Sequence, residues 1–209
     1  MFEKIKEAFT FYVGQQNELL ISYIKEKKYS EISELINQKF EPHFIDDNGD
    51  SILHHICLYG DSHIYKLFKQ FNIDINLKNE LGCTALHYAC YSDNEELVDL
   101  ICEDGAFVNA ADLERNTPLH YCAMRNSWKS IAELMQYNAD INSLNIEHRT
   151  PLHEAVIANQ KEAVLSLIEY NCELEIQDVY EKTPAFYAQK NNNESILFII
   201  NKKQTFNSK

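Results

Sequence analysis

The sequence contains few glycines and prolines, and glycine is the residue that lets a ligand approach the backbone closely. Its 209 residues include only 5 Gly and 4 Pro. A glycine-rich phosphate loop needs several glycines close together, because only a residue without a side chain lets the backbone approach the phosphate. The chain has no such cluster, no Gly-x-Ser-x-Gly motif and no His-Glu-x-x-His motif. These absences argue against the nucleotide-binding, hydrolase and metalloprotease classes that carry those motifs.

Long apolar runs and paired cysteines are also missing. No window reaches the roughly 18 apolar residues of a membrane span. The first 13 residues carry charges where a secretory signal would need its apolar core. The 6 cysteines show no Cys-x-x-Cys spacing, which predicts reduced thiols rather than a disulfide framework. We therefore expect a cytoplasmic protein without a membrane span.

Basic charge is scarce relative to acidic charge. Lys and Arg total 19 against 32 Asp and Glu, which gives a formal net charge of −13. Affinity for nucleic acid comes from cations that neutralise phosphates, so this balance argues against a nucleic-acid binder. It favours a basic or neutral partner. Apolar residues make up 45% of the chain, which is enough for a buried core and argues against disorder.

What the chain has instead is internal repetition. His54, His87, His120 and His153 follow one another at intervals of 33 residues. The same interval links further columns: Ser51, Thr84, Thr117, Thr150 and Thr183; Leu53, Leu86, Leu119 and Leu152; Asp46, Asn79, Asp112, Asn145 and Asp178; and Asn76, Asn109 and Asn142. A fixed period of this length identifies a repeat protein.

Each unit has the pattern of two short helices. Thr117 suits a helix N-cap, and Pro118 suits the first helical turn because it has no N–H to lose. After a polar break, apolar residues at helical spacing predict a second helix. The unit then leads into a turn with Gly49 or Gly82, where a positive φ is expected.

These motifs resemble the ankyrin repeat, whose pattern is a β-turn, Thr-Pro-Leu-His-x-Ala and two antiparallel helices. The closest matches are Thr84-Ala-Leu-His-Tyr-Ala89, Thr117-Pro-Leu-His-Tyr-Cys122 and Thr150-Pro-Leu-His-Glu-Ala155. The resemblance implies an all-α solenoid of stacked helix-turn-helix units joined by β-turn loops. It covers four repeats, at 46–78, 79–111, 112–144 and 145–177.

The two ends depart from the pattern, as terminal repeats do when they cover the apolar face of the stack. Residues 15–45 fit a degenerate N-terminal cap and 178–209 an altered C-terminal cap repeat, so we expect one domain over 15–209. Residues 1–14 are expected to form a separate amphipathic capping helix. Arg115, His148 and Glu181 replace the turn glycine. Those turns therefore either change conformation or hold a side chain at positive φ.

We expect no metal, no cofactor and no catalytic residue. Stacked repeats place the column histidines roughly 10 Å apart, whereas zinc needs ligands at about 2.0–2.1 Å, and the other histidines lack ligand spacing. The resemblance implies that each column histidine bonds its Thr and the turn backbone, which gives a structural set of Thr84, His87, Thr117, His120, Thr150 and His153. Cys83 falls at a turn, where an exposed, reactive thiol and an unreactive one both remain open.

The resemblance further implies that partners bind the turn tips and the exposed side of each first helix. Apolar residues occupy several tips, and tyrosines typical of interface anchors occupy the helices. The candidate binding residues are Leu81, Tyr88, Tyr91, Leu113, Glu114, Tyr121, Met124, Arg125, Ile146, Glu147, Ile157 and Tyr180. The alternative is that the tyrosines only pack between helices. If they bind, replacing Tyr88 and Tyr121 by Ala should abolish partner capture without affecting thermal melting.

The predicted function is that of a non-enzymatic scaffold, monomeric alone, that binds a partner protein through its concave face. The acidic tips predict a partner with an apolar centre and a basic rim. The alternative is a regulatory or inhibitory subunit held in a constitutive complex with an enzyme. The chain has 20 Asn, and its 16 Lys exceed its 3 Arg. This bias is typical of an AT-rich genome, and it leaves open an effector of an intracellular microbe or a virus that acts in the host cytoplasm.

Overall fold

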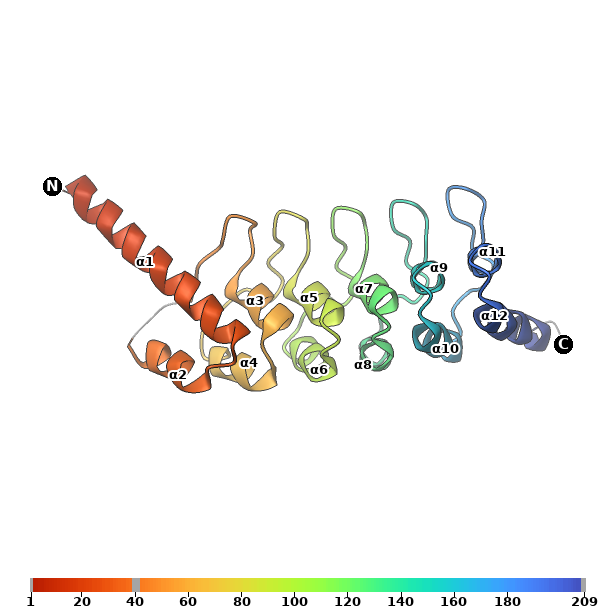
Figure 1. Ribbon diagram of the computed structural model, residues 1–209, viewed down its shortest axis with the longest axis horizontal. Coiled ribbons are helices and arrows are strands. Elements are labelled where there is room, and N and C mark those ends of the chain that lie inside the picture. The colour runs from red at the N-terminus through yellow and green to blue at the C-terminus, as the bar shows by residue number, and fades with distance from the viewer. Residues whose placement is uncertain (1, 39–41, 208–209) are drawn as a thin grey trace.

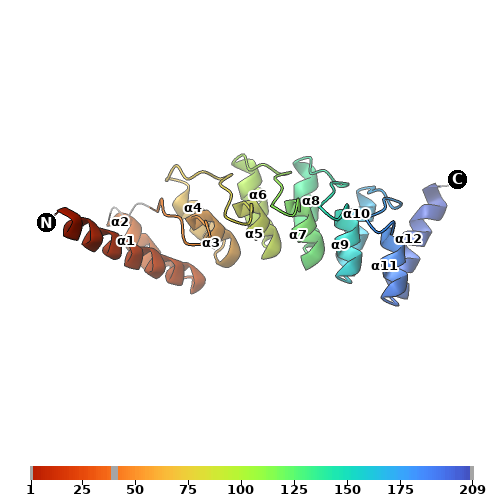
Figure 2. The ribbon, with the colours of Figure 1, turned by 90° about the horizontal axis from the view of Figure 1, so that it is seen from above.

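The computed structural model describes the backbone of residues 2–38 and 42–207, and the side chains of 14–38 and 42–205. Within these residues the chain forms 12 helices and one isolated antiparallel bridge between Ile45 and Ser51. The helices follow one another in pairs, and successive pairs stack side by side into an elongated array (Figures 1 and 2). The all-α solenoid that the sequence predicts is therefore confirmed.

The array has two rows of helices. The first pair is α1 (Phe2–Lys25) and α2 (Tyr29–Asn37). The first helices of the later pairs are α3 (Ile52–Tyr59), α5 (Ala85–Tyr91), α7 (Pro118–Arg125), α9 (Pro151–Ile157) and α11 (Pro184–Lys190). The second helices are α4 (Ser62–Phe68), α6 (Glu95–Glu103), α8 (Trp128–Gln136), α10 (Lys161–Glu169) and α12 (Glu194–Asn207). In Figure 1 the loops before α3, α5, α7, α9 and α11 all project from the side of the first helices.

We call the tips of these projections the hairpin loops, which comprise residues 46–50, 79–83, 112–116, 145–149 and 178–182. The side of the molecule formed by the hairpin loops and the exposed surfaces of the first helices is called the loop face.

The first helices begin where the sequence predicts. Thr84, Thr117 and Thr150 are N-caps with extended backbone, and a proline opens both α7 and α9. Small residues such as Ala89 and Ala155 are fully buried on these helices. Because their side chains are short, neighbouring first helices can approach closely, and α5 packs between α3 and α7.

One apolar core runs through the whole stack, from Leu20 in α1 to Ile200 in α12. Each helix pair contributes a few fully buried aliphatic side chains, such as Leu86 with Leu97 and Leu119 with Ile131. Burial of each such side chain contributes about 1.5–3 kcal/mol, and each pair gains this only from its neighbours.

The N-terminal helix extends across the boundary that was predicted between residues 14 and 15. α1 continues without a break past residue 14, where the sequence analysis separated a capping helix from the domain. Gly14 is exposed in this helix, and a glycine there costs about 1 kcal/mol relative to alanine, which is too little to end the helix. Leu20, Ile24 and Ile32 are buried, so α1 and α2 cover the end of the core. The side chains of 1–13, on which the amphipathic pattern rests, lie outside the described residues.

The turns without glycine keep the glycine conformation. Arg115, His148 and Glu181 have φ values of 62°, 55° and 58°, in the same left-handed region as Gly49 and Gly82. The second of the two alternatives therefore applies, and each of these side chains is held at a strained φ.

Candidate functional site

An Asp or Asn at the start of each hairpin loop closes the loop on itself. Oδ1 of Asp112 accepts hydrogen bonds from the backbone N–H groups of Glu114 at 2.9 Å and Asn116 at 2.8 Å. The same two bonds recur at Asp46, Asn79, Asn145 and Asp178. This side-chain oxygen adds to the backbone hydrogen bond that also closes each loop, such as that from the N–H of Asp112 to the carbonyl of Asn116 at 3.0 Å.

Neighbouring hairpin loops are tied to one another at their tips. The N–H of Leu113 donates to the carbonyl of Leu81 at 2.9 Å, and the N–H of Ile146 donates to the carbonyl of Glu114 at 2.9 Å. Equivalent bonds join the first loop to the second and the fourth to the fifth. The loops therefore form a continuous row, in which the side chains of Leu81, Leu113 and Ile146 are 63%, 71% and 53% exposed.

The column histidines join each repeat to the next. The N–H of Thr84 donates to Nδ1 of His87 at 3.0 Å, so this nitrogen is an acceptor. The proton then lies on Nε2, which donates to the carbonyl of Asn116 at 3.2 Å. His54, His120 and His153 make the same pair of contacts, with Cys83, Arg149 and Lys182 as the carbonyl partners. The turn that each histidine contacts through Nε2 thus belongs to the following repeat.

These histidines are buried in their neutral form. Burial disfavours the charged ring and lowers the pKa of His87 and of His120 to about 4. Burial lowers the pKa of His54 and His153 as well.

Tyr88 and Tyr121 connect the first helices to the hairpin loops. The hydroxyl of Tyr121 donates to Oδ2 of Asp112 at 2.8 Å, and its ring meets the ring of His87 edge-on at 5.3 Å. Tyr88 meets the ring of His54 in the same way, and Nδ2 of Asn79 donates to its hydroxyl at 3.0 Å. Both tyrosines are half-buried. Their truncation should therefore lower stability, contrary to the sequence-based expectation of unchanged melting.

Tyr91 is more accessible and lies at the edge of a pocket. It is 43% exposed, and the guanidinium of Arg125 lies 4.5 Å from the centre of its ring. Its ring meets that of Tyr121 edge-on at 6.4 Å. Beside these rings is a cavity of about 180 Å³, which we call the tyrosine pocket, lined by Leu58, Leu81, Cys83, His87, Tyr88, Tyr91 and Tyr121.

Cys83 is part of this pocket wall and not an exposed turn thiol. Its side chain is 3% exposed, and its Sγ lies 3.3 Å from the hydroxyl of Tyr121. Burial raises the pKa of the thiol, which disfavours the nucleophilic thiolate. Of the two alternatives for this cysteine, the structure supports the unreactive thiol.

The other predicted binding residues are spread along the loop face. Leu113, Glu114, Ile146 and Tyr180 are exposed at the loop tips, and Arg125 is exposed at the end of α7. Met124, Glu147 and Ile157 are half-buried. The structure brings Leu81, Tyr88, Tyr91 and Tyr121 together in one pocket and leaves the remainder as a row.

A charged cluster, which the sequence analysis missed, interrupts the tyrosine column in the fourth repeat. Arg149 forms ion pairs with Glu147, with Glu154 at 3.9 Å and with Asp178 at 3.7 Å. Its guanidinium also lies 5.5 Å from the centre of the Tyr187 ring. Burial raises the pKa of Glu154. The available signal was that Glu154 stands where the two preceding repeats have Tyr88 and Tyr121.

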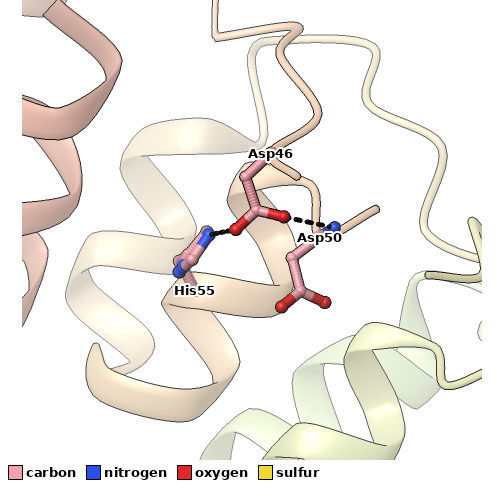
Figure 3. A group of neighbouring side chains, drawn as sticks. All are labelled: Asp46, Asp50 and His55. Carbon is pink, nitrogen blue, oxygen red and sulfur yellow. Dashed lines mark hydrogen bonds and ion pairs between the residues drawn. The ribbon is translucent and has the colours of Figure 1, made fainter. Parts of the chain in front are cut away.

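Asp46, Asp50 and His55 each place one potential ligand atom within 4.8 Å of the other two and could supply metal ligands (Figure 3). Sequence spacing did not suggest this cluster. Oδ2 of Asp46 contacts Nε2 of His55 at 3.0 Å, and Oδ1 of Asp50 accepts from Nδ2 of Asn79 at 2.7 Å. The same positions in the next repeats hold Asn79, Cys83 and Tyr88, and then Asp112, Asn116 and Tyr121, with the first and third residues again in contact. The cluster is thus one version of the contact that holds every hairpin loop to its first helix.

No helix among the described residues combines the length and apolar character that crossing a membrane requires.

Comparison with known proteins identifies the family. A sequence model of ankyrin repeats, in three copies, matches residues 20–112 and 119–209. No curated protein matches the chain.

Proposed function

This chain belongs to the ankyrin-repeat family, and we propose that it is a non-enzymatic module that binds a partner protein through its loop face. Ankyrin repeats are generally protein–protein interaction modules. Fold alone does not assign a function, so the proposal depends on the site. The observation that carries it is the row of exposed apolar side chains at Leu81, Leu113 and Ile146, on loops that are fixed to one another.

Two features make this row suited to binding. An apolar side chain at a solvated turn has no role in the core, and a contiguous apolar patch on a protein surface typically marks an interaction site. The loops are also held by the side chains of Asn79, Asp112 and Asn145 and by the bonds between tips. Binding therefore requires little ordering of the chain, which raises affinity.

The surface charge adds a requirement on the partner. Asp47, Glu80 and Glu114 are exposed at the loop tips beside the apolar row. A partner with an apolar centre and basic residues around it would be complementary, and the complex would weaken as salt screens those charges.

An affinity-capture experiment tests the proposal. The full chain and its Leu113→Asp, Ile146→Asp double variant are used as baits, with Phe198→Asp as the control. Phe198 is exposed on α12, away from the hairpin loops. We expect a partner that the wild type and the control retain and the double variant loses, as measured by quantitative mass spectrometry. Equal capture by all three baits would contradict a role for the loop face.

Two further parts of the proposal concern where the protein acts and whether it acts alone. Binding within a cytoplasm, including that of a host cell for an effector, is part of the proposal. A constitutive enzyme subunit is the alternative, and light scattering of the purified chain separates the two. A stable, folded monomer supports the independent module, whereas a chain that is soluble only with its partner supports the subunit.

A further inference from the structure

We propose that the tyrosine pocket receives one large apolar side chain of the partner, from a segment that places Lys or Arg next to it, facing Asp47 and Glu80. The inference rests on the proposed function, because it specifies the partner's chemistry at one part of the loop face.

The pocket is of a size and character for a single side chain. Its volume of about 180 Å³ equals about six water molecules at roughly 30 Å³ each. Its walls are leucine side chains, aromatic rings and a buried thiol, which hydrogen-bond water poorly. Filling it with a Leu, Met or Phe side chain should therefore strengthen binding by roughly tenfold to a hundredfold.

The walls of the pocket are fixed before a partner arrives. The hydroxyl groups of Tyr88 and Tyr121 contact Asn79 and Asp112, and His87 is held by Thr84 at one ring nitrogen. These contacts prevent the rings from collapsing into the cavity. Leu81 and Tyr91 are the exposed members, and they form the entrance.

The pocket is specific to its place in the stack. One repeat further along the chain, the positions of Leu81, Cys83 and Tyr121 are taken by Glu114, Asn116 and Glu154. One repeat back, the positions of Leu81, Cys83 and Tyr88 are taken by Asn48, Asp50 and His55. The regular spacing of the repeats would otherwise offer equivalent sites, so these polar replacements limit an apolar anchor to the second hairpin loop.

The acids of the first two hairpin loops define the neighbour of the apolar side chain. Glu80 directly precedes Leu81, and its N–H donates to the carbonyl of Asn48, the residue after Asp47, at 3.0 Å. Asp47 and Glu80 occupy the same position in the first and second hairpin loops, and both are exposed. Among the described residues no cation pairs with either carboxylate; the nearby Lys78 ammonium donates instead to the carbonyl of Ala111 at 2.7 Å. Of the arginines, Arg115 and Arg125 belong to the third repeat, where Arg125 covers Tyr91 and Arg115 follows Glu114. A partner's Lys or Arg is therefore complementary on the side of the first hairpin loop.

The test begins with a probe of defined chemistry. Random 12-residue peptides displayed on phage are selected on the full chain, and the most enriched sequence is synthesised. We expect enriched sequences to share a large apolar residue with Lys or Arg within three positions. Enrichment of sequences without that pair, or none above an unrelated bait, would overturn the inference.

The affinity of the synthetic peptide is then measured against matched variants. Leu81→Asp places a charge at the entrance but keeps the backbone bonds of residue 81, and Phe107→Asp makes the same change at a comparably exposed residue (63% and 67%) in the turn after α6. We expect at least a tenfold loss for Leu81→Asp and none for Phe107→Asp. The Asp47→Asn, Glu80→Gln double variant, which removes both charges, should weaken binding and abolish most of its salt dependence. Thermal melting of each variant establishes that it is folded.

The outcomes separate this inference from the proposed function. If the peptide is insensitive to Leu81→Asp but is lost from the Leu113→Asp, Ile146→Asp variant, the pocket is not the site and the loop face still is. If neither change affects binding, both proposals fail. If the wild-type chain dimerises and Leu81→Asp is monomeric, the pocket is filled by a second copy, and the peptide-segment proposal is overturned.

Discussion

Nε2 of His87 lies 3.2 Å from the carbonyl oxygen of Asn116, a residue 29 positions further along the chain and in the following repeat. The ring is fully buried, and its other nitrogen is occupied by Thr84. Each column histidine is therefore both a helix cap within its own repeat and a tie to the next. The stability of a solenoid is the sum of contributions from each repeat and from each interface between repeats. This histidine contributes to both.

Removing one of these column histidines should strongly destabilise the fold. In His120→Ala the Thr117 N–H loses its partner, the Arg149 carbonyl keeps only its bond from the N–H of Asn145 at 3.1 Å, and removal of the buried ring leaves a cavity. An unsatisfied buried polar group costs about 1–3 kcal/mol, so we expect the free energy of unfolding to fall by about 2–4 kcal/mol in urea titrations. His43→Ala, at an exposed position, is the control and should stay within about 0.5 kcal/mol. Equal effects of the two changes would refute the role of the column.

Stability should fall in mild acid. The folded pKa of His87 and His120 is about 4, below an unfolded value of about 6.5. Their contribution is therefore fully present above pH 6.5 and is lost as the pH falls from 6.5 to 4, up to about 3 kcal/mol for each. Glu133 and Glu154, whose pKa values burial raises, titrate in the opposite sense. We expect the net urea midpoint to drop between pH 7 and pH 4.5, with a smaller drop in His87→Gln. A midpoint that is constant or rises over this range would show the prediction to be wrong.

Tyr121 should contribute to stability through both its hydroxyl and its ring. Tyr121→Phe removes the bond to Asp112 and should lower the free energy of unfolding by about 1 kcal/mol. Tyr121→Ala also removes the ring packed on His87, and we expect a loss of about 2–4 kcal/mol. Tyr91→Ala, at the more exposed ring, should cost less than about 1 kcal/mol. If Tyr121→Ala melts like the wild type, the tyrosine contributes only to the binding surface and not to stability, as the sequence alone suggested.

The hairpin turns should respond in opposite directions to glycine. Arg115 is exposed at φ 62°, so Arg115→Gly should relieve strain and stabilise the chain by about 0.5–1 kcal/mol. Gly82 has φ 76°, and an added Cβ would lie 2.9 Å from the backbone nitrogen of Leu113. Gly82→Ala should therefore destabilise by more than about 1 kcal/mol. Changes of the same sign in the two variants, measured by thermal melting, would contradict this account of the turns.

The predictability of the fold follows from the short range of its signals. The helix starts at Thr84, Thr117 and Thr150 depend on residues within three positions of the cap. The boundary placed after residue 14 was wrong as a break between helices because Gly14 alone does not end α1.

The candidate site was less predictable, because its geometry depends on contacts between repeats. Cys83 is buried by Tyr121, 38 residues away, and Arg149 meets Asp178 across a repeat boundary. Local sequence cannot show whether a turn residue will be covered by a side chain from the next unit.

The sequence by itself determined the repeat period, the register of the helices, the positive φ at Gly49 and Gly82 and the excess of acid over base. Each of these properties follows from the identity and spacing of residues along the chain. Only the tertiary structure decided which tyrosines are available, where the apolar pocket forms and which carboxylates are left without a cation. The physical reason is that exposure and charge pairing in a solenoid are set where one repeat meets the next, as when Asn79 contacts Asp50 at 2.7 Å across 29 residues of chain.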